Sequence, residues 1–242
     1  MSERRHIHSE YDEELDGLRT LLLEMGGLVE RQLADGLKAL ITRDAELGDR
    51  VCTADYRINS LEVRIDEEAT NIIARRQPTG SDLRLLMAAI RTGTDLERIG
   101  DEAEKLGRFA VEFAAGHSPE PALLQGMERL GDAVRAVLRD ALDAFARSDV
   151  AAATAVLDGA AHVGGHYDSV MRELITYMME DPRTMQRALH ALWCARALER
   201  IADHARNVCE SVVYIEEGRN IRHRRTGAGS EPVPEKGGSP EP

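Results

Sequence analysis

Apolar residues recur every three or four positions along almost the whole chain, which is the spacing of one face of an α-helix. The first such run covers residues 8–43 and carries one continuous stripe: Leu15, Leu18, Leu22, Met25, Val29, Leu33, Leu37 and Leu40. Similar runs follow at 45–76, 81–115, 120–147, 149–180 and 183–217. No stretch of useful length alternates apolar and polar residues as a strand would. The pattern therefore predicts six long helices and an all-α protein.

Residues that interrupt or cap helices separate these runs. Asp44 offers an N-cap after the first helix, and Pro78 ends the second because a residue before proline avoids the α region. We expect a loop at 116–119, a turn at Asp181 and Pro182, and the end of the last helix at Gly218. Gly26 and Gly27 lie inside the first apolar stripe, where glycine weakens a helix. That position predicts a close contact with another helix.

One nine-residue segment occurs twice in similar form. Residues 95–103 read Asp-Leu-Glu-Arg-Ile-Gly-Asp-Glu-Ala, and residues 197–205 read Ala-Leu-Glu-Arg-Ile-Ala-Asp-His-Ala, 102 positions later. Self-similarity at a fixed offset indicates a duplicated unit. We therefore expect two antiparallel three-helix bundles in tandem, residues 8–116 and 117–217, related by an internal pseudo-two-fold axis. Residues 218–242 are rich in glycine and proline and are predicted to be a disordered tail.

The composition narrows the class of protein. The formal net charge of the 242 residues is −12, which disfavours direct binding of nucleic acid. No apolar run is long enough for a membrane span, so no membrane insertion is expected. The charged start of the chain does not resemble a signal peptide, and the three cysteines have no CxxC spacing. These features favour a cytoplasmic protein with buried thiols.

The repeat contains two pairs of carboxylates. Glu97 and Asp101 are four residues apart and project from one side of a helix, as do Glu199 and Asp203. Two acids at this spacing repel each other, and a hard cation such as Mg, Mn or Fe would offset the repulsion. The alternative is that the acids are solvated surface residues that the neighbouring Arg98 and Arg200 neutralise. The pattern alone leaves both interpretations open.

A metal site needs ligands from a second helix as well. Asp55 and Asn59 are again four apart, on the predicted second helix. A shift of 105 residues places Ala160 and Gly164 at the equivalent positions, so the second repeat lacks these oxygens. Two nearby histidines, His162 and His166, could supply nitrogen ligands or be ordinary surface residues.

Several segments together carry a resemblance to a known family. They are residues 75–78 (Arg-Arg-Gln-Pro), 81–84 (Ser-Asp-Leu-Arg) and 95–101, with 177–182 (Tyr-Met-Met-Glu-Asp-Pro) and 198–208 in the second half. In these segments the chain resembles the PhoU family of bacterial phosphate-transport and phosphate-signalling accessory proteins. The resemblance covers residues 8–217, which is all of the chain except the tail.

The resemblance implies a structure and a role. It implies two three-helix bundles, a homodimer, and metal ions (Mg, Mn, Fe or Zn) bound at the acidic motifs. The implied role is repression of the phosphate-starvation response, by coupling the ATPase subunit of a phosphate ABC transporter to a sensor histidine kinase. Carried over to this chain, the metal-binding residues are Asp55, Asn59, Glu97, Asp101, Glu199 and Asp203, with Arg98, Arg200, His204 and Asn207 in supporting positions.

The chain also departs from the family pattern. Glu102 and Lys105 stand where the family often has histidine and asparagine, whereas the second half keeps His204 and Asn207. Asn59 replaces the usual aspartate in the first half, and Ala160 and Gly164 replace an acidic pair in the second half. The substitutions weaken the case for the second cluster more than for the first.

No arrangement of Ser, His and Asp, of Cys and His, or of phosphate-binding glycines appears, so we expect no catalysis. Two alternatives remain open. A di-iron or ferritin-like enzyme needs Glu-x-x-His on inward-facing helices, and the helical region has none. A histidine phosphotransfer bundle needs one exposed histidine, for which His190 and His204 are the candidates.

Overall fold

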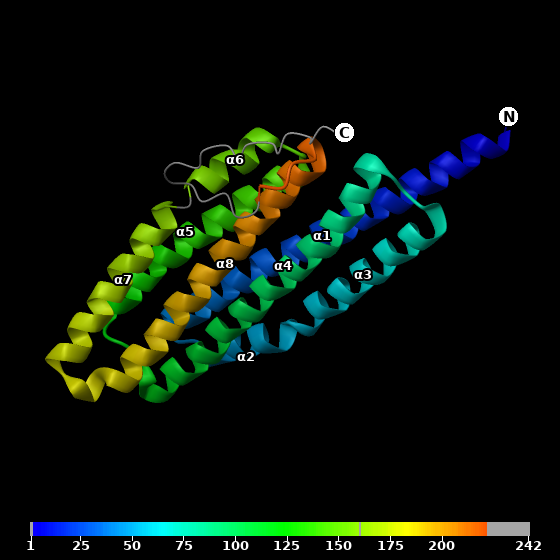
Figure 1. Ribbon diagram of the computed structural model, residues 1–242. Helices are drawn as coiled ribbons and strands as arrows, with labels where there is room; N and C mark the ends of the chain where they lie inside the picture. The colour runs from blue at the N-terminus through cyan, green and yellow to red at the C-terminus, as the bar shows by residue number, and fades with distance from the viewer. Residues whose placement is uncertain (1, 160, 222–242) are drawn as a thin grey trace, which may run out of the picture.

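The computed structural model describes residues 2–159 and 161–221 (Figure 1). Within these residues the chain forms α-helices joined by short turns, and no strand occurs among them. The α-helices are α1 (Ser2–Thr42), α2 (Ala45–Ala54), α3 (Tyr56–Arg76), α4 (Gly80–Glu112), α5 (Pro121–Ala146), α6 (Val150–Gly159), α7 (Ala161–Glu180) and α8 (Met185–Glu217). The prediction of an all-α protein is confirmed. None of the described helices has the length and apolar character that crossing a bilayer requires.

The helices form two bundles that lie side by side (Figure 1). In the first bundle α4 packs against α1, α2 and α3, and in the second α8 packs against α5, α6 and α7. The bundles meet where α4 packs against α8 and where α1 packs against α5. Burial of one apolar stripe per helix explains this arrangement, because Leu96, Ile99, Leu198 and Ile201 have no exposed surface.

The second predicted helix of each bundle is interrupted. The prediction of one continuous helix over 45–76 and another over 149–180 was therefore wrong. α2 ends at Ala54 and α3 begins at Tyr56, with Asp55 between them at φ −58° and ψ −33°. In the second bundle α6 ends at Gly159 and α7 begins at Ala161. The sequence does not reveal the first break because the buried Val51 and Ile58 are seven residues apart and keep the helical period across it.

The predicted helix ends agree with the structure in most places. The Asp44 side chain accepts a hydrogen bond from the Leu47 N–H at 2.9 Å, which is the expected N-cap. α8 ends at Glu217 and is followed by Gly218 at φ 69°, where a residue with a Cβ would be strained. The loop predicted at 116–119 instead begins inside a π-helical turn, Phe113–His117, which Gly116 closes at φ 98°.

The long helices α4 and α8 are antiparallel and relate the two bundles. Residue numbers rise along α4 as the numbers of their partners fall along α8. The pairs are Arg84 with Ile215, Asp95 with His204, Glu102 with Arg200, and Phe109 with His190. Ile99 and Ile201 are equivalent positions of the repeat and lie midway along this series. The internal pseudo-two-fold axis therefore passes between α4 and α8 near these two residues.

A reciprocal contact joins α1 to α5. Gly26 makes room for Leu142, because a methyl group at Gly26 would lie 2.7 Å from Leu142 Cδ2. Gly131 makes room for Leu37 in the same way, and both residues of this pair lie 105 positions from those of the first. The close contact predicted at Gly26 is confirmed. No such contact exists at Gly27, where an added Cβ would meet nothing within 4 Å.

A second pair of glycines brings α2 close to α4. A Cβ at Gly48 would lie 2.6 Å from the Gly107 carbonyl oxygen, and a Cβ at Gly107 would lie 2.8 Å from the Gly48 oxygen. Because both obstructing atoms belong to the backbone, a side chain here would force the helices apart. The end of α2, and with it Asp55, therefore lies close to α4.

We predict that Gly48→Ala destabilises the protein. Overpacking against a backbone atom costs about 1–3 kcal/mol, which corresponds to a fall in Tm of roughly 2–12 °C for a chain of this size. Gly27→Ala is the matched control and should raise Tm slightly, since alanine is favoured over glycine in an open helix position by about 0.5–1 kcal/mol. Thermal unfolding followed by circular dichroism measures both. An unchanged Tm in Gly48→Ala would contradict the close approach of α2 and α4.

An ion-pair network ties α1 to the end of α3. Arg76 donates to both carboxylate oxygens of Glu14, at 3.0 and 3.1 Å, and Arg75 lies 3.3 Å from the same carboxylate. The hydrogen bonds from Arg76, more than the charge of Arg75, lower the pKa of Glu14. A carboxylate whose folded-state pKa is lowered stabilises the fold above its unfolded-state pKa, and that contribution is lost as the pH falls through the folded-state value.

We therefore expect Glu14→Gln to lower Tm at pH 7 by an amount equivalent to about 1 kcal/mol or less. The difference from the wild type should shrink as the pH falls below the ordinary pKa of a glutamate, about 4.3, and be lost below the lowered folded-state pKa of Glu14. Thermal melts between pH 3 and 7 measure it. Glu13→Gln changes an exposed neighbouring acid and should show no such pH-dependent difference. A Glu14→Gln difference that did not change with pH over this range would contradict the assignment.

A candidate metal centre

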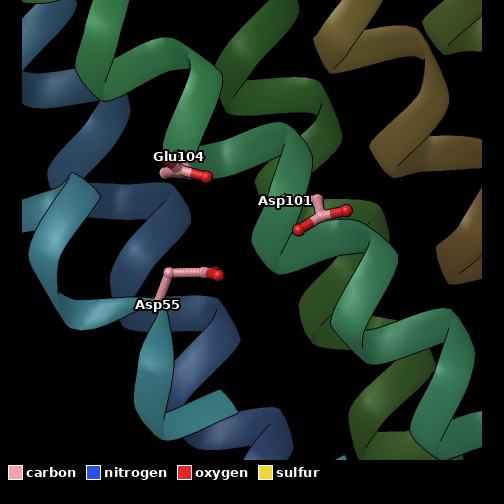
Figure 2. Close-up of side chains that lie close together, drawn as sticks. All are labelled: Asp55, Asp101 and Glu104. Carbon is pink, nitrogen blue, oxygen red and sulfur yellow. The ribbon is translucent and has the colours of Figure 1, made fainter. Parts of the chain in front are cut away.

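The break between α2 and α3 presents one buried carboxylate to α4. Asp55 is 8% exposed, and it forms no ion pair in the part of the chain whose side chains are described. Figure 2 shows its carboxylate pointing across to α4. An unpaired buried carboxylate is costly unless hydrogen bonds or a cation compensate for its lost hydration.

Asp55 meets two further acids, Asp101 and Glu104, which project from successive turns of α4 (Figure 2). One carboxylate oxygen from each of the three residues lies within 4.8 Å of the others. Three carboxylates converge here from two separate helices, as a coordination site requires. It is the only such group of three among the described residues.

Glu97 lies one turn before Asp101 on the same face of α4. It is outside the group of three, but burial, followed by the charge of Asp101, raises its pKa. Asp55 contributes to this shift as well. Glu97 therefore faces the same negative field as the cluster.

Two arginines partly neutralise the cluster from its exposed side. Arg98 lies 3.4 Å from Glu97 and 3.7 Å from Asp101, and Arg108 lies 3.3 Å from Glu104. Both guanidinium groups are more than half exposed, so water screens these pairs. Four carboxylates against two arginines leave the site negative.

Two amides hold the Asp55 carboxylate in place. Asn59 Nδ2 donates to Asp55 Oδ2 at 3.0 Å, and Gln32 Nε2 donates to Asp55 Oδ1 at 3.2 Å and to the Val51 carbonyl at 3.3 Å. Asn59 thus turns its amide nitrogen, and not its oxygen, toward the cluster. In this geometry Asn59 supports Asp55, and its assignment as a metal ligand remains a prediction.

Gln32 leaves its own oxygen without a partner. The side chain is 95% buried, and Oε1 has no hydrogen-bond partner. Oε1 and Asp55 Oδ1 lie against Gly100, since a Cβ there would be 3.3 and 3.2 Å from them. Gly100 therefore leaves space beside Asp55. The equivalent residue in the second repeat is Ala202, whose Cβ takes up that space.

These donors fit a hard cation. Carboxylate and amide oxygens are the ligands preferred by Mg²⁺, Mn²⁺ and Ca²⁺, and oxygens on one ion lie within a few ångströms of one another. A bound cation would supply positive charge to the cluster and a ligand position open to a partner. The residues in place to hold it are Asp55, Asp101 and Glu104, with Glu97 adjacent.

Glu104 was missed by the sequence analysis. Its signal was present, because Glu104 lies three residues after Asp101 and seven after Glu97, on one helical face. The search relied on the repeat, however, and the equivalent position in the second half is Arg206. A ligand that only one repeat carries cannot be found by comparing the two.

The second acidic pair forms no comparable cluster among the described residues. Glu199 pairs with Arg196, and Asp203, whose side chain is 65% exposed, lies 3.8 Å from Arg206. Of the two positions opposite this pair, Ala160 lies outside the described residues and Gly164 is exposed. The assignment of Glu199 and Asp203 to a metal remains a prediction.

The supporting residues of the second repeat lie at the contact between the bundles. His204 Nδ1 and Asn207 Nδ2 each lie 2.9 Å from Oδ1 of the buried Asp95. Arg200 lies 3.0 Å from Glu102, which is buried and also pairs with Lys105 at 2.9 Å. These four contacts satisfy two buried carboxylates, and the three from His204, Asn207 and Arg200 join α4 to α8.

The two histidines considered as alternative ligands lie close to each other. The rings of His162 and His166 are 5.2 Å apart and nearly perpendicular. No third ligand joins them in the described part of the chain.

Two tandem antiparallel bundles with an acidic cluster on one of them define a class of helical repeat protein. The PhoU domain family matches this chain over residues 22–110 and 127–212, once in each bundle. The chain is 46% identical to the phosphate-specific transport system accessory protein PhoU of Serratia marcescens over 220 residues, 90% of this chain and 89% of that protein. The PhoU of Escherichia coli K12 is 44% identical over 220 residues, 90% of each chain.

Solved structures agree with this assignment. The crystal structure of PhoU from Pseudomonas aeruginosa superposes with a TM-score of 0.82 at 44% identity, covering 86% of this chain and 100% of that one. The phosphate transport system regulatory protein PhoU from Streptococcus pneumoniae superposes with a TM-score of 0.79 at 26% identity, covering 87% and 99%. The chain belongs to the PhoU family.

We predict that Mn²⁺ stabilises the chelator-treated protein through Asp55. A cation at about 100 times its Kd adds roughly 2.7 kcal/mol, or a rise in Tm of about 5–10 °C. Asp55→Asn should abolish most of this rise, because it removes the carboxylate that faces Asp101 and Glu104. Asp66→Asn, an exposed acid of α3 outside the cluster, is the matched control and should keep it. Equal stabilisation of Asp55→Asn and the wild type would contradict the assignment of the site.

Proposed function

We propose that this protein regulates phosphate transport and represses the phosphate-starvation response when phosphate is plentiful. It would do so in the cytoplasm, by coupling a phosphate ABC transporter to a sensor histidine kinase. The observation that carries the proposal is the near full-length similarity to proteins named phosphate-specific transport system accessory protein. The match to the Serratia marcescens protein spans 90% of this chain and 89% of that protein, so the resemblance is not limited to one bundle.

The proposed mechanism is docking. Long helices packed into two bundles give extended surfaces that change little in shape, which suits binding of other proteins. A divalent cation at Asp55, Asp101 and Glu104 would neutralise the net negative charge of one such surface. The occupancy of the site would then bias which partner surface can approach, since like charges oppose close contact.

The partners in this proposal are the ATPase subunit of the transporter and the kinase. We also propose a homodimer, as the family resemblance implies. Two copies would present two acidic clusters and allow simultaneous contact with both partners.

We propose no catalytic step. The accessory naming of the relatives supports a protein that acts by binding. The phosphotransfer alternative gains little from the geometry, because the His204 ring is held by Asp95 and is only 21% exposed. His190 packs between Phe109 and His117, at ring distances of 5.7 and 6.0 Å.

Complementation tests the proposal. The full chain is expressed in an Escherichia coli strain that lacks its own PhoU, and alkaline phosphatase output and phosphate uptake are measured in high phosphate. We expect phosphatase output to fall several-fold relative to an empty vector. Asp55→Asn should reduce this repression, whereas the exposed control Asp66→Asn should preserve it.

The result needs a folded protein to be decisive. Abundance and helicity of each variant are therefore measured in the same cells and on purified protein. A folded, abundant wild-type chain that leaves phosphatase output unchanged would contradict the regulatory role. Full repression by Asp55→Asn would instead contradict only the part assigned to the cation.

A further inference from the structure

A groove on the first bundle lies between α1 and the α2–α3 segment. Its volume is about 240 Å³. The wall from α1 carries Leu28, Arg31, Gln32 and Asp35, and the wall from α2 and α3 carries Leu47, Arg50, Val51, Ala54, Arg57 and Ile58. The spacing explains the arrangement, because residues three, four and seven apart share one face of a helix.

Three arginines line this groove, and none of them is neutralised. Arg31, Arg50 and Arg57 form no ion pair within the part of the chain whose side chains are described. The protein has 43 acidic and 31 basic residues, so unpaired arginines are unexpected. Most of its other described arginines lie beside a carboxylate. The groove therefore collects positive charge on an otherwise acidic molecule.

The arginines keep their terminal nitrogens available. Arg31 Nε donates to the Gly27 carbonyl at 3.2 Å, and Arg57 Nε donates to the Tyr56 hydroxyl at 3.2 Å. In both cases the two terminal NH₂ groups have no bond to protein. A guanidinium held through Nε with both terminal nitrogens free is arranged to bind a tetrahedral oxyanion at two points.

We infer that this groove, which we call the arginine groove, binds inorganic phosphate. The site goes beyond the proposed function, because it belongs to a different surface from the acidic cluster and has the opposite charge. Arg50 and Arg57 would contact the anion from the α2–α3 wall and Arg31 from the α1 wall. The volume admits the ion together with some of its water.

Asp35 is the acidic residue of the lining, and it would make the groove prefer phosphate over sulfate. It forms no ion pair among the described side chains, so its oxygens are free to accept a hydrogen bond. At neutral pH hydrogen phosphate carries a P–OH group that can donate, whereas sulfate carries no proton. A carboxylate in the groove therefore accepts phosphate and repels sulfate, as a hydrogen-bonding site rejects an analogue that lacks the matching group.

The groove also touches the acidic cluster. Gln32 lines the groove, and its Nε2 donates to Asp55 Oδ1 at 3.2 Å. The same amide therefore lies between the bound anion and the carboxylate that faces Asp101 and Glu104. A movement of the Gln32 side chain on binding in the groove would therefore change its hydrogen bond to Asp55 in the acidic cluster.

Calorimetric titration of the chelator-treated full chain tests the inference. Inorganic phosphate and sulfate are titrated at matched ionic strength. We expect saturable binding of phosphate, with sulfate about tenfold weaker or more. The Arg50→Ala/Arg57→Ala variant should lose about 100-fold in phosphate affinity, since each charge-assisted contact is worth about tenfold or more.

Two further variants test the parts of the site. Asp35→Asn should bring the affinities for phosphate and sulfate close together, because the repulsion of sulfate is removed. Arg64→Ala, an exposed arginine of α3 outside the groove, is the matched control and should bind phosphate like the wild type. Asp55→Asn should also bind phosphate, so failure of the cation site and failure of this inference are distinguishable.

Three outcomes would overturn the inference. One is the absence of saturable phosphate binding up to about 10 mM. Another is unchanged binding by the double arginine variant while its helicity and Tm match the wild type. The third is binding of O-phosphoserine at least about tenfold tighter than inorganic phosphate, which would assign the groove to a phosphorylated side chain.

Discussion

The rest of this structure depends on the close packing of α4 against two other helices, α8 and α2. One side of α4 lies against α8 and joins the bundles, and another side lies against α2 at the paired glycines Gly48 and Gly107. Backbone atoms meet there, so the distance between the helices is fixed by sterics and not by flexible side chains. The position of Asp55 relative to Asp101 and Glu104 follows from that distance.

The duplicated unit has diverged in the use of its polar residues. In the first repeat the face of α4 that carries Glu97 and Asp101 meets a carboxylate from the neighbouring helices, and Gly100 leaves space for it. In the second repeat Glu199 and Asp203 face arginines, while His204 and Asn207 satisfy Asp95 across the bundle contact. Buried carboxylates need partners, and the two repeats meet that need in different ways.

The α2–α3 segment separates two regions of opposite charge. Asp55 faces α4 and the acidic cluster, whereas Arg50 and Arg57 face the arginine groove beside α1. Gln32 contacts both regions. A short break in one helix therefore places a cation-type site and an anion-type site within one side chain of each other, which gives an accessory protein two chemically distinct surfaces.

The sequence by itself determined the helical class, the duplication and most helix ends. Period, N-cap and C-terminal glycine are local signals, and Asp44 and Gly218 act as their chemistry predicts. It also pointed to Asp55, Glu97 and Asp101 as a group, although whether they bind metal is still a prediction. Only the tertiary structure showed that the helix is interrupted at Asp55 and that Glu104 joins the cluster. It also showed that the Asn59 side chain turns its nitrogen toward Asp55. It alone brought Arg31 to Arg50 and Arg57. The physical reason is that helix periodicity fixes which residues share a face, whereas the partner of that face depends on how closely two backbones can approach.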